Sequence, residues 1–479
     1  MRRTKIICTI GPAVQSTEML RALVEHGMNV ARLNFSHGDH AVFERVIRDL
    51  RSCEKEFARP IGIMADIQGP KLRVGKLEKG ELVLKNGDTA WITTEATVGG
   101  VKDGRNLIPV SYKEFVKDVG IEHTVLLDDG LIGLQVAEKV PPNLIRCVVI
   151  NGGTLKENKG INVPEASFSA RTITEKDYED ILFCLQNDVD FIALSFVRSA
   201  QEVRHLKGFV ESRGKRCQVL AKIEKRDALV HLDEIIDTAD GILVARGDLA
   251  VEVGNEMVPV LQKKIIRKCN LKAKTVIIAT QMLMSMVDNP RPTRAEASDV
   301  ANAIVDGTDA LMLSNETAVG KYPVESLQMM ERIVREMEHE ATYQPILYNE
   351  WQLPANGQVA IALLQSAVRL ASIVKARLIV VMTQSGQSAL LVSKCRPRNR
   401  LFAITGSLET YRHLSIKWGV EGLMMADMEE LISQTAVFEA IGHRLLALNL
   451  CGSGDKIVIT AGLPRLAHGS TNTIKVHQI

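Results

Sequence analysis

The sequence predicts an α/β protein: a (β/α)8 barrel, a small β-barrel domain inserted into it, and a C-terminal α/β domain. Three observations lead to this fold class. Eight short apolar runs rich in β-branched residues alternate with helical patterns. The alternation breaks once, between residues 70 and 190, where the chain shows short strand patterns and turns. A separate alternation of helix and strand patterns fills residues 357–479.

The eight apolar runs are nearly continuous and end in polar clusters, which is typical of parallel strands buried on both faces. Eight strand–helix units predict a (β/α)8 barrel. The runs span residues 5–11, 29–37, 61–70, 190–196, 218–224, 241–249, 275–281 and 310–317.

Helix signals lie between the runs. The segment 16–27 places Met19, Leu20, Leu23 and Val24 on one stripe and reaches a natural stop at Gly27. Capping-box patterns predict two further helix starts, at Thr174 with Asp177 and at Thr293 with Glu296.

The interruption of the barrel predicts a small all-β domain on top of it. Residues 72–168 show alternating apolar and polar pieces, and Asn86-Gly87 is a hairpin signal. After residue 340 periodicity is lost and Pro, Asn and Gln accumulate, which indicates a domain boundary. We therefore expect a barrel of residues 1–69 and 169–342, a lid of residues 70–168, and a C-terminal domain of residues 343–479.

Composition excludes several function classes. The 59 Lys+Arg and 57 Asp+Glu give a net charge of +2 without long runs, which argues against nucleic acid or an acidic membrane surface as a partner. No uncharged apolar stretch reaches the ~18 residues of a membrane span. The eight cysteines are scattered without zinc-ligand spacing, which predicts a reduced, cytoplasmic protein.

Polar residues that end the eight runs are the candidate functional residues, because barrels of this kind carry catalysis at the carboxyl ends of their strands. Pairs spaced by two residues point to one face of a strand, and three such pairs occur: Arg32 with Asn34, Lys222 with Glu224, and Arg246 with Asp248. The other run-end residues are Thr9, Ser36, Asp66, Ser195, Thr280, Ser314 and Glu316.

Each of these residues also has an ordinary structural explanation. Lys222 and Glu224 alone are equally well explained as an ion pair at a strand end, and Asp248 as a helix N-cap. Thr280 alone is best explained as a packed strand residue. Separate structural explanations would have to hold at many strand ends, whereas one site for an anionic substrate explains them together.

The residue types indicate the chemistry. Glu224 and Asp248 supply hard oxygens that Mg²⁺ accepts while leaving positions for substrate and water. Arg32, Arg73 and Lys222 suit phosphoryl or enolate oxygens. No P-loop and no dinucleotide-binding glycine motif occurs. The residues themselves therefore predict Mg²⁺-dependent chemistry on a phosphorylated or carboxylated small molecule.

The sequence resembles the pyruvate kinase family, in its bacterial form, from end to end. The strings that carry the resemblance include KIICTIGPA, NVARLNFSHG, ADIQGPKLR, LLDDG, NKGINVP, AKIE, DGILVARGDLAVE and NPRPTRAEASDVANAIVDGTDALMLSNETA. The resemblance implies transfer of the phosphoryl group of phosphoenolpyruvate to ADP, giving ATP and pyruvate in glycolysis. It also implies Mg²⁺ or Mn²⁺ as cofactor, a C-terminal effector domain and a homotetramer.

Carried over residue by residue, the resemblance assigns roles in one site. Glu224 and Asp248 hold the divalent metal, and Lys222 neutralises charge on the phosphoryl group and the enolate. Arg32 contacts the phosphoryl group, while Thr280 and the backbone around Gly247 bind the substrate carboxylate. The nucleotide side comprises Arg73, which is also expected to act in catalysis, with Asn34, His37 and Lys159. We expect an ordered-water relay near Thr280 to protonate the enolate.

Two further expectations follow from the resemblance. Family members that require K⁺ typically have Glu at the position of Lys71, so a fixed ammonium beside Asn34, Ser36 and Asp66 predicts that K⁺ is not required. Residues Thr383, Ser385, Gly386 and Ser388 precede a helical pattern and form the expected pocket for a phosphorylated allosteric effector. Gln387 stands where the family commonly has Arg, and an ordinary capped turn is the competing explanation of this loop.

Two other function classes compete with this interpretation. A Mg²⁺-dependent carbon–carbon lyase acting on pyruvate-type substrates would share the barrel and the carboxylates, but has no use for a lid or a nucleotide. A non-catalytic metabolite sensor would be expected to have lost catalytic residues, and here none is lost.

Overall fold

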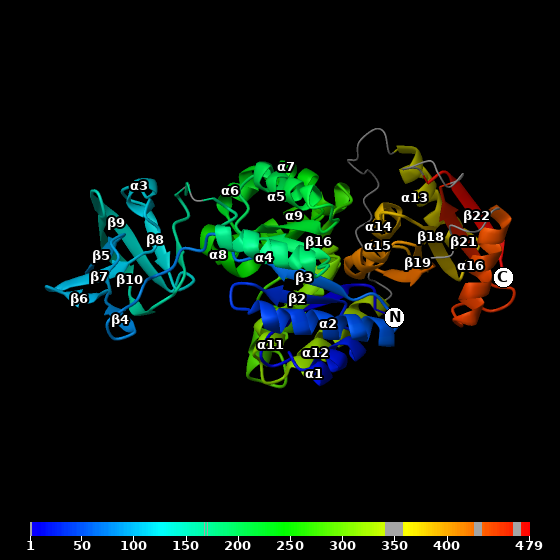
Figure 1. Ribbon diagram of the computed structural model, residues 1–479, viewed down its shortest axis with the longest axis horizontal. Coiled ribbons are helices and arrows are strands. Elements are labelled where there is room, and N and C mark those ends of the chain that lie inside the picture. Colours follow the sequence, from blue (N-terminus) through cyan, green and yellow to red (C-terminus); the bar gives the residue numbers. More distant parts are fainter. Residues whose placement is uncertain (1, 167, 170, 341–357, 426–433, 463–470) are drawn as a thin grey trace.

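The computed structural model describes residues 2–166, 168–169, 171–340, 358–425, 434–462 and 471–479. The expected domain boundary at residue 343 lies outside these residues, and so do residues 167 and 170, which flank the expected end of the lid at residue 168. Figure 1 shows three parts in a row: a β-rich lid at one end, a central barrel, and a C-terminal α/β part at the other end.

The central part is a closed eight-stranded barrel, which confirms the predicted fold class. The strand order is β1-β17-β16-β15-β14-β13-β3-β2, and every neighbouring pair is parallel. The bounds are β1 Lys5–Ile10, β2 Val30–Asn34, β3 Gly62–Asp66, β13 Phe191–Leu194, β14 Gln218–Ile223, β15 Gly241–Ala245, β16 Thr275–Ala279 and β17 Ala310–Leu313.

Helices surround the barrel, and several of them start at side-chain caps provided by the local sequence. The stripe of α1 buries Leu20, Leu23 and Val24, and both predicted capping boxes are present. The helical elements are α1 Thr17–Glu25, α2 His40–Glu56, α4 Glu175–Gln186, α5 Ala200–Ser212, α6 Arg226–Val230, α7 Leu232–Thr238, α8 Arg246–Val253, η1 Asn255–Met257, α9 Val258–Leu271, η2 Met284–Val287, α10 Arg294–Asp306, α11 Asn315–Ala318 and α12 Pro323–His339.

The strand predicted from residues 241–249 is shorter than expected. The run 241–249 was expected to be a strand with Arg246 and Asp248 on one face, but β15 ends at Ala245 and these two residues lie in the first turn of α8. The N-cap of this helix is Ala245, so Asp248 is not the cap residue either. The chain turns directly from strand to helix here, which places Asp248 at the mouth of the barrel.

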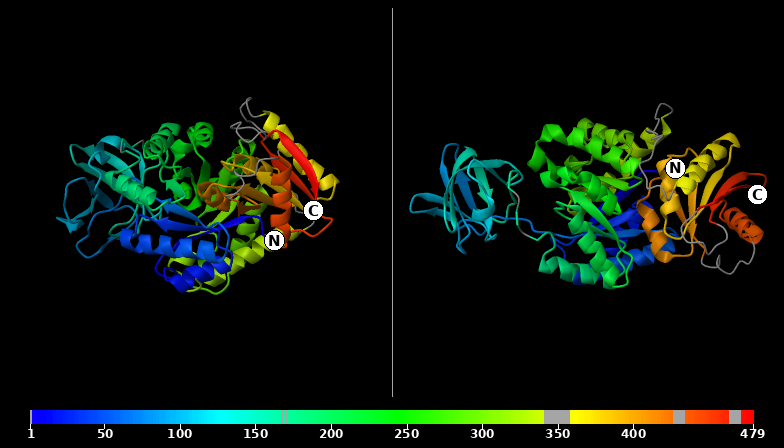
Figure 2. Two further views of the ribbon diagram at one scale, coloured as in Figure 1. Left: turned by 45° about the vertical axis from the view of Figure 1, so that its right-hand side comes forward. Right: turned by 90° about the horizontal axis from the view of Figure 1, so that it is seen from above.

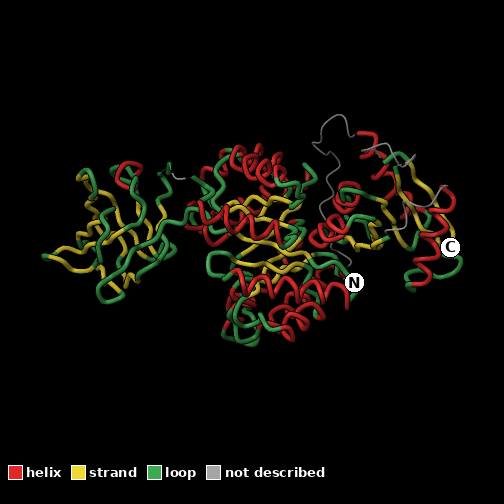
Figure 3. The backbone as a smooth tube through the Cα atoms, viewed as in Figure 1, coloured by secondary structure: helices red, strands yellow, loops and turns green. Residues whose placement is uncertain are grey.

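Apart from the short helix α3, the regular elements of the lid are strands, which loops connect (Figure 3). Its strands form a seven-stranded sheet, β12-β8-β9-β10-β5-β7-β6, and a two-stranded sheet, β11-β4. The bounds are β4 Glu81–Leu84, β5 Thr89–Thr93, β6 Gly100–Lys102, β7 Arg105–Pro109, α3 Phe115–Asp118, β8 Thr124–Leu127, β9 Ile132–Val140, β10 Leu144–Asn151, β11 Gly153–Lys156 and β12 Ile161–Asn162. The lid has its own buried core and stands away from the barrel on two connecting segments (Figure 2).

The prediction of a hairpin at Asn86-Gly87 is wrong in one respect. The turn exists, with Gly87 at φ +83°, but it does not join two paired strands. The strand before it, β4, pairs with β11, and the strand after it, β5, pairs with β10. Asn86 Oδ1 accepts a hydrogen bond from Gly152 N at 2.6 Å, so the turn is held by the connection between β10 and β11.

The C-terminal part is a five-stranded sheet in the order β20-β19-β18-β21-β22, with β22 antiparallel to its neighbour. The elements are α13 Gln358–Ile373, β18 Leu378–Met382, α14 Gln387–Lys394, β19 Arg400–Thr405, α15 Leu408–His413, η4 Leu414–Ile416, β20 Val420–Met424, α16 Gln434–Ala447, β21 Lys456–Ala461 and β22 Thr473–Gln478. Within the described ranges, the structure contains no helix of the length and apolarity that a bilayer crossing requires.

Buried charges join the C-terminal part to the floor of the barrel. Asp309, which precedes β17, is completely buried and accepts hydrogen bonds from Lys394 Nζ at 2.5 Å and Arg396 Nη2 at 2.9 Å. Arg412 Nη2 pairs with Glu54 Oε1 of α2 at 2.9 Å. Both cations of the Asp309 cluster come from the end of α14 or directly after it, so this helix is anchored to the barrel.

Candidate active site

The carboxyl ends of four neighbouring strands bring together five polar side chains at the mouth of the barrel. Arg32 comes from β2, Asp66 from β3, Ser195 directly follows β13, and Lys222 and Glu224 lie at the end of β14. The strands are adjacent in the barrel, β2-β3-β13-β14 in order, so residues far apart in the sequence converge. The convergence expected from the strand ends is therefore present.

Asp66 is the centre of this cluster. Its carboxylate accepts hydrogen bonds from Arg32 Nε at 2.8 Å and from Lys222 Nζ at 3.0 Å. Burial alone would raise the pKa of Asp66, but Lys222 and Arg32 together hold it below its ordinary value. Asp66 is thus a fixed negative charge that positions two cations.

Lys222 is held from three sides. Besides Asp66, its ammonium contacts Ser195 Oγ at 2.8 Å and Glu224 Oε1 at 2.9 Å. Burial would lower the pKa of Lys222, but the two carboxylates outweigh it and raise the pKa above its ordinary value. Lys222 is therefore a permanent positive charge at neutral pH.

Glu224 and Asp248 are the two carboxylates expected to hold a divalent metal. The second oxygen of Glu224 accepts a hydrogen bond from Phe196 N at 2.7 Å, whereas the Asp248 side chain is 27% exposed in the first turn of α8. Burial is the main cause that raises the pKa of Glu224; Lys222 opposes it, and Asp248 raises the pKa further.

The repulsion between these carboxylates is of the kind that a divalent cation relieves, so the residues fit such an ion. Among the residues that the structure describes, no group of three or more His, Cys, Asp or Glu side chains could hold a metal. A hard cation at Glu224 and Asp248 would therefore take its other ligands from substrate and water, as for Mg²⁺ in phosphoryl-transfer sites.

Thr280 and Gly247 are in direct contact. Gly247 N donates a hydrogen bond to Thr280 Oγ1 at 2.8 Å, and the Thr280 hydroxyl donates to its neighbour's carbonyl, Ala279 O, at 2.6 Å. Thr280 has φ +68°, a left-handed conformation that is rare and costly for a β-branched residue. Arg246 Nη2 donates to Thr280 O at 2.9 Å and so supports this strained turn.

The residues expected on the nucleotide side come from both the lid and the barrel. On the lid, Arg73 Nη1 donates to Asn158 O at 3.0 Å and Lys159 Nζ pairs with Asp128 Oδ1 at 2.8 Å. On the barrel, Asn34 Oδ1 accepts from Ser36 N at 3.2 Å and shapes the loop that carries His37.

The positive charges of Arg73 and Lys71 on the lid side affect His37 in the barrel loop. Burial is the main cause that lowers the pKa of His37, and the charges of Arg73, Lys71 and Arg32 lower it further. No direct bond joins the lid residues Arg73 and Lys159 to Asn34 or His37 in the described part of the chain.

Lys71 occupies a different position from the one expected. Its ammonium lies 3.4 Å from Asp248 Oδ1, while Asp66 is paired with Arg32 and Lys222. Lys71 thus brings its charge from the first lid connection to Asp248 of α8, rather than into the Asp66 cluster.

The expected effector loop is a capped turn at the start of α14. Thr383 Oγ1 accepts from Gly386 N at 2.9 Å, and Ser385 Oγ accepts from Gln387 N at 3.4 Å. Gly386 has φ +81°, a conformation suited to glycine, and Ser388 Oγ lies 2.8 Å from Thr471 Oγ1.

Two contributions to the site were missed by sequence reasoning. Ser195 was recognised as the end of a run but received no role, although it contacts Lys222 directly. Phe196 adopts φ +55° and turns its N–H toward Glu224, and no sequence signal indicates this conformation. The convergence of Asp66, Ser195 and Lys222 depends on the strand order of the barrel.

Comparisons with known proteins were consistent over the full length of the chain. Residues 1–327 match the family model "Pyruvate kinase, barrel domain", and residues 361–477 match "Pyruvate kinase, alpha/beta domain". The pyruvate kinase of Sporosarcina psychrophila is 44% identical over 484 residues, covering 100% of this chain and 81% of the relative. The pyruvate kinase of Geobacillus stearothermophilus is 43% identical, covering 100% of this chain and 80% of the relative.

A solved structure agrees with these matches. The crystal structure of a pyruvate kinase from Cryptosporidium parvum superposes with a TM-score of 0.91 at 37% sequence identity. The match covers 100% of this chain and 96% of that structure's chain. The similarity therefore extends over all three parts of the fold and not only over the barrel.

Proposed function

This chain belongs to the pyruvate kinase family, and from that premise we propose how its residues transfer the phosphoryl group of phosphoenolpyruvate to ADP. It is a phosphotransferase of glycolysis, and the comparisons give no support to the lyase or the sensor alternative. The observation that carries the residue assignment is the buried Asp66–Lys222–Glu224 cluster at the mouth of the barrel.

Lys222 and Arg32 are the cations of the transfer step. Asp66 orients both of them, so neither has to be reorganised when negative charge shifts during transfer. Arg32 binds the phosphoryl group, and Lys222 stabilises the charge that develops on the phosphoryl oxygens and on the enolate. Alignment and charge stabilisation are sufficient, because phosphoryl transfer requires no nucleophile from the protein.

Gly247 and Thr280 bind the carboxylate of the substrate. Gly247 N lies at the start of α8, where a backbone donor suits an anion, and in the structure it is directed to the Thr280 hydroxyl. A substrate carboxylate would compete for this donor. A proton reaches the enolate through ordered water near Thr280, because the threonine hydroxyl by itself is a poor acid.

The lid closes the nucleotide side of the site. Arg73 and Lys159 move with the lid, while Asn34 and His37 stay with the barrel, so ADP or ATP is held only when the two parts approach each other. The two connecting segments of the lid, seen from above in Figure 2, are the place where this motion occurs.

Glu224 and Asp248 hold Mg²⁺, or Mn²⁺ in its place. The ion supplies neutralisation of phosphoryl and enolate oxygens when it is bound. Replacing Glu224 with Gln removes one ligand charge and is expected to weaken Mn²⁺ binding about tenfold to hundredfold. Electron paramagnetic resonance of free Mn²⁺ measures this directly. Glu234→Gln, at an exposed position of α7, is the control, and equal Mn²⁺ affinity in both variants would remove Glu224 from the metal site.

Lys71 replaces a monovalent cation, so K⁺ is not required. The support is the fixed ammonium at the root of the lid, which lies 3.4 Å from Asp248 Oδ1 and not beside Asp66 as the sequence predicted. We expect equal activity of the wild type in K⁺, Na⁺ and tetramethylammonium salts at fixed ionic strength. Lys71→Glu is expected to become dependent on K⁺, whereas Lys76→Glu, an exposed lysine of the same segment, is not. Strong K⁺ stimulation of the wild type would contradict this role.

The loop Thr383–Ser388 binds a phosphorylated effector at the start of α14. Besides the hydroxyls and backbone donors of the loop, the buried Lys417 supports this assignment, because its Cε lies 3.4 Å from the position of a Cβ on Gly386. Burial lowers the pKa of Lys417 to about 8, so a bound phosphate would also stabilise its charged form.

Ser385→Glu tests the effector loop. A carboxylate at this position repels a phosphate, so the variant is expected to lose activation by sugar phosphates and nucleoside monophosphates while keeping its basal rate. Ser453→Glu, on an exposed turn of the same domain, is the control. Activation curves that coincide for wild type and Ser385→Glu would place the effector elsewhere.

Assembly and location complete the proposal. Family membership supports a homotetramer, which light scattering of the purified protein would measure. All eight cysteines are free thiols, and six of them are buried, which fits a reducing cytoplasm.

A further inference from the structure

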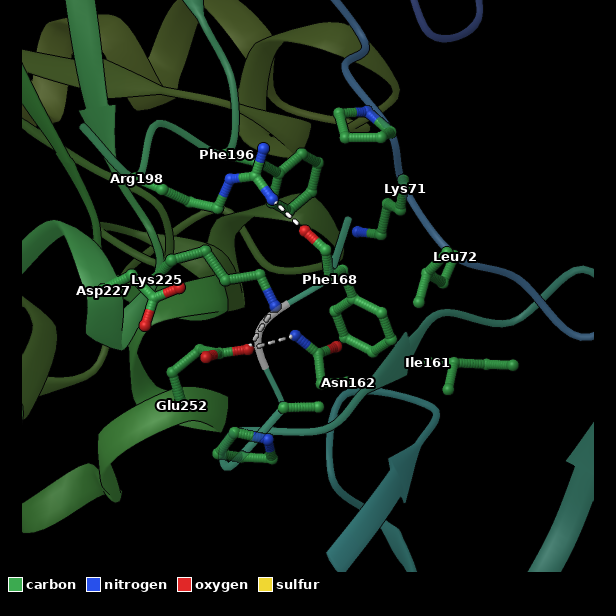
Figure 4. A pocket seen from close by; sticks show the side chains of 13 residues that line it. Lys71, Leu72, Ile161, Asn162, Phe168, Phe196, Arg198, Lys225, Asp227 and Glu252 are labelled. Atoms are coloured by element: carbon green, nitrogen blue, oxygen red, sulfur yellow. Dashed lines mark hydrogen bonds and ion pairs between the residues drawn. The ribbon is translucent and has the colours of Figure 1, made fainter. Parts of the chain in front are cut away.

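A buried carboxylate ties the root of the lid to the barrel. Glu252 Oε1 accepts hydrogen bonds from Lys225 Nζ at 2.6 Å and from Asn162 Nδ2 at 2.9 Å. The side chain of Glu252 is only 2% exposed. Figure 4 shows the three side chains pointing toward one another between the barrel and the lid.

The three residues come from three elements that matter for the site. Lys225 directly follows Glu224 at the end of β14. Glu252 lies four residues after Asp248, one turn further along α8. Asn162 belongs to β12, which pairs with β8 inside the lid. One carboxylate therefore contacts the lid and both elements that carry the proposed metal ligands.

Other parts of the lid also approach helix α8 of the barrel. Lys71, on the first lid connection, approaches Asp248 at 3.4 Å. A Cβ built on Gly130, in the turn after β8, would lie 3.9 Å from Val251 Cγ1. The lid thus contacts α8 at Asp248 and at Glu252 and passes near it at Val251, and the Asn162–Glu252 contact is buried.

A small pocket lies beside this contact. Its volume is about 50 Å³, and it lies between the lid root and the barrel (Figure 4). Its apolar lining includes Leu72, Ile161, Phe168 and Phe196. Glu252, Lys225 and Asn162 form their hydrogen bonds with one another rather than with a ligand in the pocket. This region is therefore suited to connect the lid to the barrel at a fixed point.

We propose that Glu252 is a positioning residue. It fixes the lid and the carboxylates of Glu224 and Asp248 in defined positions relative to one another. This inference rests on the metal role of those carboxylates given under the proposed function. Glu252 itself touches no reacting group. It acts through Lys225, which fixes the end of β14, through its own helix, which fixes Asp248, and through Asn162, which fixes the lid.

The physical reason is the small tolerance of phosphoryl transfer to misalignment. A displacement of about 1 Å can cost about a hundredfold in rate, and partners that orient ligand residues are worth about tenfold to hundredfold in metal affinity or activity. Glu252→Ala would leave the Lys225 ammonium and the Asn162 amide without their acceptor. Both the end of β14 and the lid root would then be free to shift.

The experiment compares three variants with the wild type. Glu252→Ala removes the whole contact, Glu252→Gln keeps an acceptor but removes the charge, and Asn162→Ala removes only the lid side. Glu256→Ala is the control, because it makes the same chemical change one turn further on at an exposed residue. The readouts are small-angle X-ray scattering without ligands, Mn²⁺ affinity, and kcat with the KM of each substrate.

We expect Glu252→Ala to change the scattering profile, to weaken Mn²⁺ binding about tenfold and to lower kcat about tenfold to hundredfold. Asn162→Ala should change the scattering and the KM for ADP while Mn²⁺ affinity stays within about threefold. Glu252→Gln should restore the wild-type scattering and part of the Mn²⁺ affinity. Glu256→Ala should match the wild type throughout.

A role limited to stability would give the opposite pattern. If Glu252→Ala unfolds at a lower temperature but keeps the scattering profile, Mn²⁺ affinity and kcat, Glu252 is not a positioning residue. If Glu252→Ala does not fold, Asn162→Ala and Glu252→Gln decide, and wild-type values in both would overturn the proposal. If Glu224→Gln leaves Mn²⁺ affinity unchanged, the metal assignment fails instead, and the scattering still reports on the lid.

Discussion

Lys222→Met is expected to lower kcat by about a thousandfold or more while the affinity for phosphoenolpyruvate changes by less than about tenfold. The ammonium of Lys222 is fixed by Asp66, Ser195 and Glu224 before any substrate arrives. A charge that interacts mainly with the transition state contributes to the rate rather than to ground-state binding.

Substrate titration and single-turnover kinetics separate these two effects. Arg32 still pairs with Asp66 in the variant, so binding of the phosphoryl group retains one cation. Lys215→Met, which makes the same change at an exposed ion pair with Asp188, is the control and should keep the wild-type rate. A Lys222→Met enzyme within about tenfold of the wild-type kcat would remove Lys222 from the centre of the mechanism.

Asp309→Ala is expected to lower the free energy of unfolding by about 3–5 kcal/mol, because it leaves two buried cations without their partner. Lys394 and Arg396 both contact this carboxylate, and it also accepts from Val276 N at 2.8 Å. Burial already pulls the pKa of Lys394 below its ordinary value, and Asp309 is the charge that opposes this.

Calorimetry measures the loss as a shift of the first thermal transition by more than about 5 °C. Asp288→Ala is the control, since the pair of Asp288 with Lys321 is more than two-thirds exposed on both sides and should contribute nothing measurable. Equal transition temperatures for Asp309→Ala and Asp288→Ala would show that the Asp309 cluster does not anchor the C-terminal part. Because α14 starts at the proposed effector loop, the variant should also respond less to effectors.

The barrel could be predicted from the sequence because its strands are buried on both faces. A run such as residues 275–281 has no polar residue between Thr275 and Thr280, and this continuous apolar character distinguishes a barrel strand from an amphipathic one. The helix starts at Thr174 and Thr293 could be predicted equally well, because a capping box depends on residues only three positions apart.

Features that depend on long-range contacts could not be predicted. The chain turns from β15 into α8 directly after Ala245, and nothing in the run 241–249 indicates that Asp248 lies on a helix. The Asn86-Gly87 turn is readable as a turn, but its flanking strands pair with β11 and β10 because of the packing of the whole lid.

The site was predicted by residue type but not by geometry. Strand ends indicated Lys222 and Glu224, whereas the central position of Asp66 required the strand order β2-β3-β13-β14. The left-handed backbone of Thr280 and Phe196 is imposed by neighbouring elements and leaves no trace in side-chain type. Glu252 was not recognised, because its partners Lys225 and Asn162 come from different parts of the chain.

The most direct test of the account is a coupled assay for pyruvate formed from phosphoenolpyruvate and ADP by the purified chain, with and without Mg²⁺. We expect pyruvate and ATP in equal amounts in the presence of Mg²⁺, and loss of the reaction when the metal is chelated. An enzyme that forms no pyruvate under these conditions, or forms it at the same rate without a divalent metal, would contradict the account.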